Sequence, residues 1–418
     1  MNELMSFWAQ WLRPSAGLPT VQWALLLAVA SVCGYLVYRH TGLPKVIGYS
    51  LVGMLAGLLG FDAAWPLQGI GLFLMELGIA IVLFDAGGRI SWRWFRHNPM
   101  VLVQSVAESA LTYFAVYWTM LWLNVPVIAA GPIALVAMAA SPAVLSRVVA
   151  DTRASGPVTD RAIVLATLST LYALTLGSAN AELLARPASS VLESISPIFV
   201  VLGVSVVVGA LLSLLIRVAL RYMSPSSENT SILALALIAA CTAMTAHLGG
   251  SAPLAALIAG MLIKQLHARP WALPRQLGTA SSVITMLMFV LVSTVAAQSD
   301  WSAAIAGTVL ALIVVRLMAK ALGVGIGNVG SGASWRQAVW VGCAMMPMSS
   351  IALLIASQFM TASPETGVLI SSIALPTILL MEVFGAVIAT VALYRAGETS
   401  KPWAALPHAS SGEENRES

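Results

Sequence analysis

Two proline-containing interruptions of apolar segments are the features of this sequence best suited to chemistry. Ser141-Pro142 interrupts the apolar stretch from 127 to 150, and Pro347 interrupts the stretch from 335 to 359. A proline removes one backbone hydrogen bond from a helix. In hydrocarbon the freed groups cost several kcal/mol unless protein or water satisfies them, so broken helices are typical of transport paths. For either segment taken alone, a simple proline kink is the alternative.

Hydroxyl side chains accompany these interruptions. Ser349 and Ser350 follow the second proline, and Ser169-Thr170 lies about halfway along the apolar stretch from 161 to 183. At about 1.5 Å per helical residue, these positions are expected near the middle of a bilayer core of about 30 Å. Hydroxyls, unwound carbonyls and half-helix ends can bind a partly dehydrated cation, or an anion at half-helix amino ends. The candidate ion path comprises Ser141, Pro142, Ser169, Thr170, Pro347, Ser349 and Ser350.

Four carboxylates, Glu76, Asp85, Glu108 and Glu382, lie within apolar segments and are candidate proton carriers, because ionisable residues are costly there. For Glu76 and Glu382 the favoured role is structural, with the carboxylate bonding helix ends or Ser/Thr across the bundle. Asp85 and Glu108 are candidates for a substitute carrier. A carrier needs burial that lets it both bind and release a proton near neutral pH.

Arg316 and Lys320 are spaced i to i+4 and therefore share a helix face. We expect them near the cytoplasmic end of their span, with their charged ends reaching lipid headgroups. The alternative is that one of them pairs with Asp85 or Glu382 inside the bundle.

The elements that position these residues are membrane helices. With 59% hydrophobic and 9% charged residues in 418, the chain has too little polar surface for a soluble domain of its size. The fold class predicted is an all-α polytopic membrane protein with about thirteen transmembrane helices. The predicted spans are roughly 20–38, 44–59, 67–87, 99–123, 127–150, 161–183, 196–220, 231–247, 252–266, 279–297, 301–324, 335–359 and 365–393.

The distribution of basic residues predicts the orientation. Of the 21 Lys and Arg residues, all except Arg13 and Arg186 fall in or beside alternate connections. The positive-inside rule then places the amino terminus outside and the carboxyl terminus in the cytoplasm. We expect residues 1–19 to form an interfacial segment and residues 395–418 to form a disordered cytoplasmic tail. The transmembrane domain would cover 20–394, in a plasma membrane of bacterial inner-membrane type.

An odd number of spans predicts an inverted repeat, with the seventh span as the linker helix. The repeats would cover about 20–184 and 231–394, and the linker helix about 196–222. The two proline interruptions then fall in the fifth span of each repeat. Paired interruptions at matching positions are a sequence pointer to a transporter's midplane site, and they predict crossing discontinuous helices.

Several segments, in this order and on this topology, resemble the second family of monovalent cation/proton antiporters, whose membrane domain is sodium/hydrogen exchanger-like. The segments that carry the resemblance are TGLPKVIGYSLVGMLAGLLG (41–60), ELGIAIVLFDAGG (76–88), ASPAVLSRVVADTRASGP (140–157), SAPLAALIAGMLI (251–263), WVGCAMMPMSSIALLIAS (340–357) and LLMEVFGAV (379–387). The resemblance implies two inverted six-helix repeats and a core domain that moves against a dimerisation domain. It implies secondary active transport of a monovalent cation, Na⁺ or K⁺, against a proton, in a homodimer.

The chain departs from the family at its charged residues. The family places one or two acids midway along the sixth span, where this chain has Ser169 and Thr170. It also places a basic residue just after the proline of the twelfth span, where this chain has Met348. Losing both together avoids an unpaired buried charge. Two alternatives therefore stay open: an uncoupled or solute carrier on the same fold, and a non-transporting membrane sensor.

No catalytic motif, metal-ligand spacing, cofactor motif or nucleic-acid-binding feature is evident. Cys33, Cys241 and Cys343 lie in apolar segments without a paired spacing, which favours packing roles. Gly325, Gly327 and Gly330 satisfy GxGxxG but follow a membrane helix instead of a strand, so we interpret them as a connector. Gly53 and Gly57 form GxxxG and predict close helix packing. The expected partners are the lipid bilayer, the cation and the proton, and no enzyme activity is expected.

Overall fold

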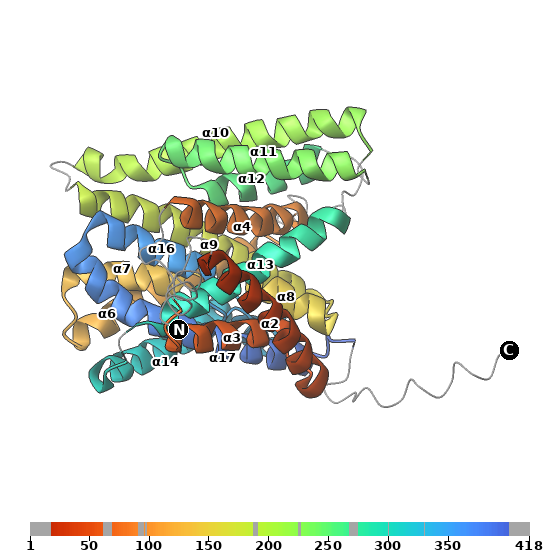
Figure 1. The fold of residues 1–418 in the computed structure, drawn as a ribbon. Coiled ribbons are helices and arrows are strands. Elements are labelled where there is room, and N and C mark those ends of the chain that lie inside the picture. Colours follow the sequence, from red (N-terminus) through yellow and green to blue (C-terminus); the bar gives the residue numbers. More distant parts are fainter. Residues whose placement is uncertain are drawn as a thin grey trace, which may run out of the picture.

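The computed structural model describes residues 18–61, 69–90, 96, 98–186, 191–224, 227–266, 275–299, 301–329 and 331–400. Within these ranges the chain forms helices that run side by side, and Figure 1 shows their arrangement. In the first half the helices are α2 (Leu18–Thr41), α3 (Lys45–Leu58), α4 (Gly69–Arg89), α6 (Met100–Trp122), α7 (Val127–Met138), α8 (Pro142–Thr152) and α9 (Pro157–Ala185). A long helix, α10 (Val191–Tyr222), leads to α11 (Glu228–His247), α12 (Ala252–Leu266), α13 (Arg275–Ala297), α14 (Ala303–Ile326), α15 (Trp335–Ala344), α16 (Ser350–Ala362) and α17 (Pro364–Arg395).

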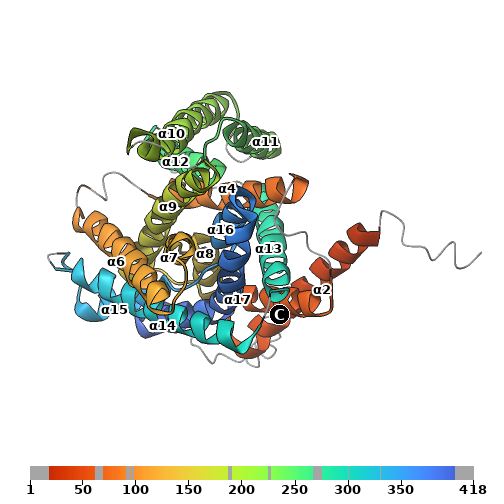
Figure 2. The same cartoon turned by 90° about the vertical axis from the view of Figure 1, so that its left-hand side faces the viewer.

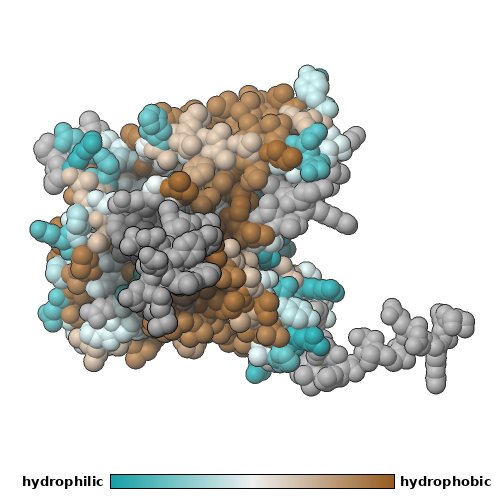
Figure 3. All heavy atoms as spheres, in the orientation of Figure 1, coloured by the Kyte–Doolittle hydropathy of each residue, from teal (hydrophilic) through white to brown (hydrophobic). Residues whose placement is uncertain are grey.

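The surface is that of a membrane protein. On the face shown in Figure 3, hydrophobic residues form a broad central band, with hydrophilic residues gathered at its two opposite ends. Among the described residues, nine helical segments are long and apolar enough to cross a bilayer, and four further apolar helices are shorter. The predicted all-α polytopic membrane fold is therefore confirmed. The number of thirteen crossings stays a prediction, and the interfacial segment lies almost wholly outside the described residues.

The helix pairs follow the order of two inverted repeats. In that order α3 corresponds to α12, and α4 corresponds to α13. Helix α4 packs closely against α12, and α3 packs closely against α13. Each of these pairs joins a helix of one repeat to a helix of the other. If every helix is replaced by its counterpart in the other repeat, the first pair becomes the second. The third close pair, α6 with α14, joins corresponding helices of the two repeats. Figure 2 shows α10, α11 and α12 grouped along one side of the remaining bundle.

Glycines allow these close pairs. A Cβ at Gly57 would lie 2.5 Å from the Thr294 carbonyl, and a Cβ at Gly53 would collide with the Val290 carbonyl. The close packing predicted for this GxxxG is therefore confirmed. On α14, a Cβ at Gly323 would lie 2.5 Å from the Glu108 Cα, which brings α6 and α14 into direct backbone contact.

The glycines interpreted as a connector are partly helical. Gly325 lies in the last turn of α14, and Gly327 caps that helix. A Cβ at Gly327 would lie 2.6 Å from the Gln104 Cα on α6. The interpretation as a flexible connector is therefore wrong for these two positions, because both belong to the packed helix end.

The segment after α17 returns to the loop between α8 and α9. The Glu398 carboxylate accepts hydrogen bonds from the backbone N–H groups of Val158, at 2.8 Å, and Thr159, at 2.7 Å. Gly156, which precedes the helix at φ 157°, has no side chain to cap it. Glu398 thus caps α9 from outside the helix, and the predicted tail disorder does not hold for residues 396–400.

Candidate functional site

Two helices are broken near the centre of the molecule. Helix α7 ends at Met138 and α8 begins at Pro142, while α15 ends at Ala344 and α16 begins at Ser350. Pro142 is the first residue of α8, and Ser141 caps it by accepting a hydrogen bond from the Val144 N–H at 3.3 Å. Proline suits this position because its missing N–H has no intrahelical partner there. The two breaks predicted from Ser141-Pro142 and Pro347 are confirmed.

The Arg316 guanidinium joins the two breaks. Its Nε donates to the Ala137 carbonyl at 2.7 Å, and its Nη2 donates to the Ala139 carbonyl at 2.9 Å. Its Nη1 donates across to the Met346 carbonyl at 2.7 Å. The last carbonyls of a helix carry partial negative charge and lack intrahelical partners. A planar cation with several donors satisfies the ends of α7 and α15 together.

Lys320 lies one turn further along α14 and pairs with Glu108 on α6. Its Nζ contacts Glu108 Oε1 in an ion pair, and it donates to the Met138 carbonyl at 3.1 Å. The side chains of both ion-pair partners are fully buried. Ser109 also donates to Glu108, at 3.1 Å, with Thr112 at 3.5 Å. The carboxylate therefore has three donors around it.

The expected surface role of Arg316 and Lys320 is wrong, and so is their alternative pairing with Asp85 or Glu382. Both side chains are fully buried. They lie in the middle of the described bundle because the broken helices present carbonyls that only donors from neighbouring helices can satisfy. Their partners are those carbonyls and Glu108.

The hydroxyls of α9 bind the same break. Ser169 donates to the Met138 carbonyl at 2.8 Å, and Thr170 donates to the Ala140 carbonyl at 3.1 Å. The four successive carbonyls from 137 to 140 thus all accept side-chain hydrogen bonds, from Arg316, Lys320, Ser169 and Thr170. The carbonyls of the α7–α8 break therefore bind two cationic side chains of the protein, Arg316 and Lys320.

The start of α16 is held by Glu382 on α17. The Glu382 carboxylate accepts hydrogen bonds from Ser349 and from Ser293, both at 2.9 Å. These are the serine contacts that a structural role for Glu382 predicts. Beside them, the Ser350 hydroxyl is fully buried and has no hydrogen-bond partner in the described part of the chain.

The two remaining acids lie on α4. Asp85 forms an exposed ion pair with Arg89 one turn away, at 2.8 Å, with side-chain exposures of 34% and 56%. Asp85 therefore does not lie beside the two helix breaks. Glu76 is half-buried near mid-helix, and no hydrogen bond or ion pair reaches it from the described residues. In the described ranges, no group of three or more His, Cys, Asp or Glu side chains is placed to hold a metal ion.

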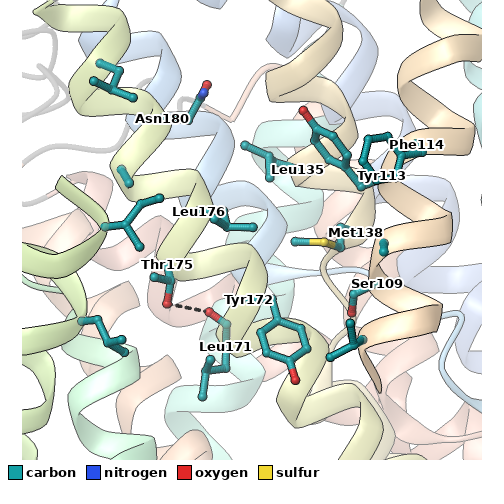
Figure 4. Close-up of a pocket in the computed structure, with 16 residues that line it drawn as sticks. Ser109, Tyr113, Phe114, Leu135, Met138, Leu171, Tyr172, Thr175, Leu176 and Asn180 are labelled. Atoms are coloured by element: carbon teal, nitrogen blue, oxygen red, sulfur yellow. Dashed lines mark hydrogen bonds between the residues drawn. The ribbon is translucent and has the colours of Figure 1, made fainter. Parts of the chain in front are cut away.

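A cavity of about 680 Å³ lies beside the Glu108–Lys320 pair. Figure 4 shows residues of two walls: α6 contributes Ser109, Tyr113 and Phe114, and one face of α9 contributes Leu171, Tyr172, Thr175, Leu176 and Asn180. Leu135 and Met138 of α7 lie between them, and Ile198 and Leu202 of α10 complete the lining. Apolar side chains form most of this wall.

The comparisons with known proteins agree with the geometry. The family described as sodium/hydrogen exchanger, transmembrane, matches residues 27–394. The chain belongs to this family. No curated protein matches it significantly.

Solved structures of an archaeal antiporter share the exchanger fold. The sodium proton antiporter MjNhaP1 from Methanocaldococcus jannaschii at pH 8 superposes with a TM-score of 0.70, at 15% identity, over 90% of this chain and 98% of that one. An electron-microscopy structure of MjNhaP1 gives a TM-score of 0.74, at 16% identity, over 93% and 100% of the two chains. At these identities the likeness establishes the fold alone.

Within this exchanger-family chain, sequence reasoning missed the central cations. The absence of a basic residue at Met348 suggested that the second break lacks a cation, whereas Arg316 supplies one from α14. Two signals were available in the sequence. Charged residues within an apolar span usually face the bundle interior, and two broken helices leave carbonyls that need donors.

Proposed function

We propose that this exchanger-family protein is a secondary transporter that exchanges a monovalent cation for a proton, with Glu108 as the cation-binding carboxylate. The observation that carries the proposal is the fully buried Glu108–Lys320 ion pair beside the crossing of the broken helices. The acids that the family places on the sixth span are absent. A carboxylate on α6 takes their place.

The exchange follows from the cost of an unpaired buried charge. When a cation reaches Glu108, it replaces the Lys320 ammonium as the partner of the carboxylate. An ammonium left buried without a counter-charge is strongly disfavoured, so Lys320 releases its proton. When a proton returns to Lys320, the ion pair re-forms and the cation leaves. The net charge of the site is the same before and after each step.

The residues at the two helix breaks allow the ion site to open to either side of the membrane. The path residues are Ser141, Pro142, Ser169, Thr170, Pro347, Ser349 and Ser350, which lie at or against the breaks. Half-helices whose ends meet at a midplane site can tilt as units and expose that site to one side at a time. Ser350, with its unpartnered hydroxyl, is the group here most available to a passing ion.

The orientation, the membrane, the oligomeric state and the transported cation belong to the same proposal. The basic residues outside the bundle support a carboxyl terminus in the cytoplasm and an amino terminus outside. A bacterial inner membrane and a homodimer accord with the family resemblance. Na⁺ and K⁺ are the first cations to consider.

Proton movement in proteoliposomes tests the proposal. The purified protein is reconstituted with a pH-sensitive dye inside, and sodium, potassium, lithium and permanently charged ammonium ions are added in turn. We expect at least one cation to change the internal pH, and we expect Glu108→Gln to abolish the response. Asp85→Asn is the matched control, because it makes the same kind of change at an exposed carboxylate and should leave the response intact.

Two results would contradict the proposal. One is an undiminished response in folded Glu108→Gln, which would place the cation site elsewhere. The other is no response to any cation in folded wild-type protein, which would leave an uncoupled or solute carrier and a non-transporting membrane sensor as the alternatives.

A further inference from the structure

The cavity beside the ion pair has the size of a small-molecule site. Its volume of about 680 Å³ falls within the range of about 300–1,000 Å³ typical of ligand pockets. A dehydrated alkali ion needs a shell of oxygen atoms that replaces its hydration water. This cavity is much larger than such a shell and is mostly apolar.

The few polar groups in the wall are largely engaged. Ser109 donates to Glu108, Tyr172 shares a hydrogen bond with Ser105 at 2.9 Å, and Thr175 donates to its own helix. Of the five polar lining residues, only Tyr113 and Asn180 form no hydrogen bond with another described residue. Two separate groups cannot build a coordination shell for a small ion.

Aromatic rings favour a different kind of cation. Tyr113 stacks on Tyr117 with ring centroids 6.0 Å apart and meets Phe114 edge-on at 5.3 Å. Figure 4 shows Tyr113 and Phe114 on α6 and Tyr172 on α9, on different walls of the cavity. Ring faces attract organic cations, including quaternary ammonium ions, through the electrostatic quadrupole of the ring.

The inner end of the cavity is separated from the exchange pair by Ser109 and Met138, and Glu108 and Lys320 themselves do not line it. Ser109 lines the cavity and donates to the Glu108 carboxylate, while Met138 lines it and accepts from Lys320. The outer wall includes Val106 and Phe114, each 55% exposed on the apolar surface. The cavity thus runs from the exposed apolar surface to two residues that hydrogen-bond the exchange pair, so a small displacement of these side chains would connect it to the Glu108 carboxylate.

We propose that this cavity is the substrate site and that the substrate is a monovalent organic cation with an apolar body, such as an aryl or alkyl ammonium ion. The apolar body lies between α6, α9 and α10, and the charged nitrogen approaches Glu108 and displaces Lys320. One positive charge matches the single carboxylate. This inference rests on the proposed exchange of a cation for a proton.

Benzyltrimethylammonium is a suitable probe, because it is aromatic and permanently charged and so carries no proton across the bilayer itself. In the proteoliposome assay we expect it to move protons through the wild-type protein. Ala110→Phe places a ring inside the cavity and should raise the half-maximal concentration by about tenfold or abolish the response. Val103→Phe is the matched control, because position 103 is on the same helix, 50% exposed and outside the cavity lining.

A second variant shows whether a loss of response in Ala110→Phe comes from the filled cavity or from misfolding. Leu202→Trp narrows the cavity from α10, and its effect on benzyltrimethylammonium should match that of Ala110→Phe. If both variants and Val103→Phe respond like wild type, the cavity is not the substrate site.

The alternative occupants give distinguishable results. Proton movement with sodium, potassium or lithium, none with benzyltrimethylammonium, and no effect of Ala110→Phe would overturn this inference and leave the proposed exchange standing. A phospholipid that copurifies with the wild type and is lost in Ala110→Phe, without any response to the organic cation, would identify the cavity as a lipid site. No response to any cation would overturn both proposals.

Discussion

The buried ion pair makes a quantitative prediction about stability. Replacing Lys320 by methionine keeps the size of the side chain and removes its charge. Glu108 then stays fully buried with only the Ser109 and Thr112 hydroxyls, at 3.1 and 3.5 Å, as donors. Removing one partner of a buried pair costs about 3–5 kcal/mol, because the other charge is left uncompensated. We expect Lys320→Met to lower the free energy of unfolding by that amount.

Glu108→Gln and the double variant with Lys320→Met distinguish the energy of the ion pair from the effect of changing side-chain packing. Glu108→Gln removes the counter-charge of Lys320, which must then lose its proton or stay buried as an unpaired ammonium, and the cost should also be about 3–5 kcal/mol. In Glu108→Gln/Lys320→Met no buried charge is left unpaired. The double variant should therefore be more stable than the sum of the single effects predicts, by about 3 kcal/mol or more.

An exposed pair in the same protein supplies the control. Asp85 and Arg89 are 34% and 56% exposed and lie on one helix, so Arg89→Met should cost about 0–1 kcal/mol. The measurement is the free energy of unfolding in mixed detergent micelles, followed by tryptophan fluorescence. Equal costs for Lys320→Met and Arg89→Met, or strictly additive effects in the double variant, would refute the reasoning.

Three further predictions concern the crossing and its supports. Arg316→Lys should destabilise the protein by about 3–5 kcal/mol in the same unfolding assay, because one ammonium cannot bind both breaks as the planar guanidinium does; unchanged stability would show that the bridge is dispensable. Glu398→Gln should weaken the cap of α9 by about 0.5–2 kcal/mol and speed hydrogen exchange of its first backbone amides, which exchange rates equal to wild type would contradict. Gly87→Ala should lower the thermal unfolding temperature because its Cβ meets the Leu257 carbonyl, whereas Gly71→Ala, with open space around it, should not.

Residue types along the chain predicted the two helix breaks, but they did not predict which side chains donate hydrogen bonds to the carbonyls that the breaks expose. A proline disrupts a helix wherever it stands, so both breaks and their matching positions could be predicted from sequence. GxxxG likewise predicts a close approach at Gly53 and Gly57. Which helix approaches, and which donor reaches a broken end, depends on contacts between residues far apart in the chain. Arg316, for example, bonds carbonyls 179 and 30 residues away.

The hydroxyls at the crossing illustrate the same limit. The sequence predicts Ser169 and Thr170 as ion-path residues because they stand midway along their span, where the family has acids. In the structure both donate to carbonyls of the first break, so they hold the α7–α8 junction against α9. Their location opposite the first break could be predicted from the sequence, and their role in an ion path stays a proposal. The sequence could not supply the direction of the hydrogen bonds, because that depends on which carbonyls the neighbouring break exposes.

The placement of the ion pair constrains how an exchange can occur. Glu108 lies where α6 and α14 are packed backbone to backbone, with Gly323 opposite the Glu108 Cα and Gly327 opposite the Gln104 Cα. The Gln104 amide also donates to Asn328 at 3.1 Å across the same interface. Separating these helices would expose close backbone contacts and buried polar groups, so a cation cannot enter by parting them. In the proposed exchange the Lys320 side chain moves instead, because its flexible four-carbon stem allows the ammonium to leave Glu108 while the helix stays in place.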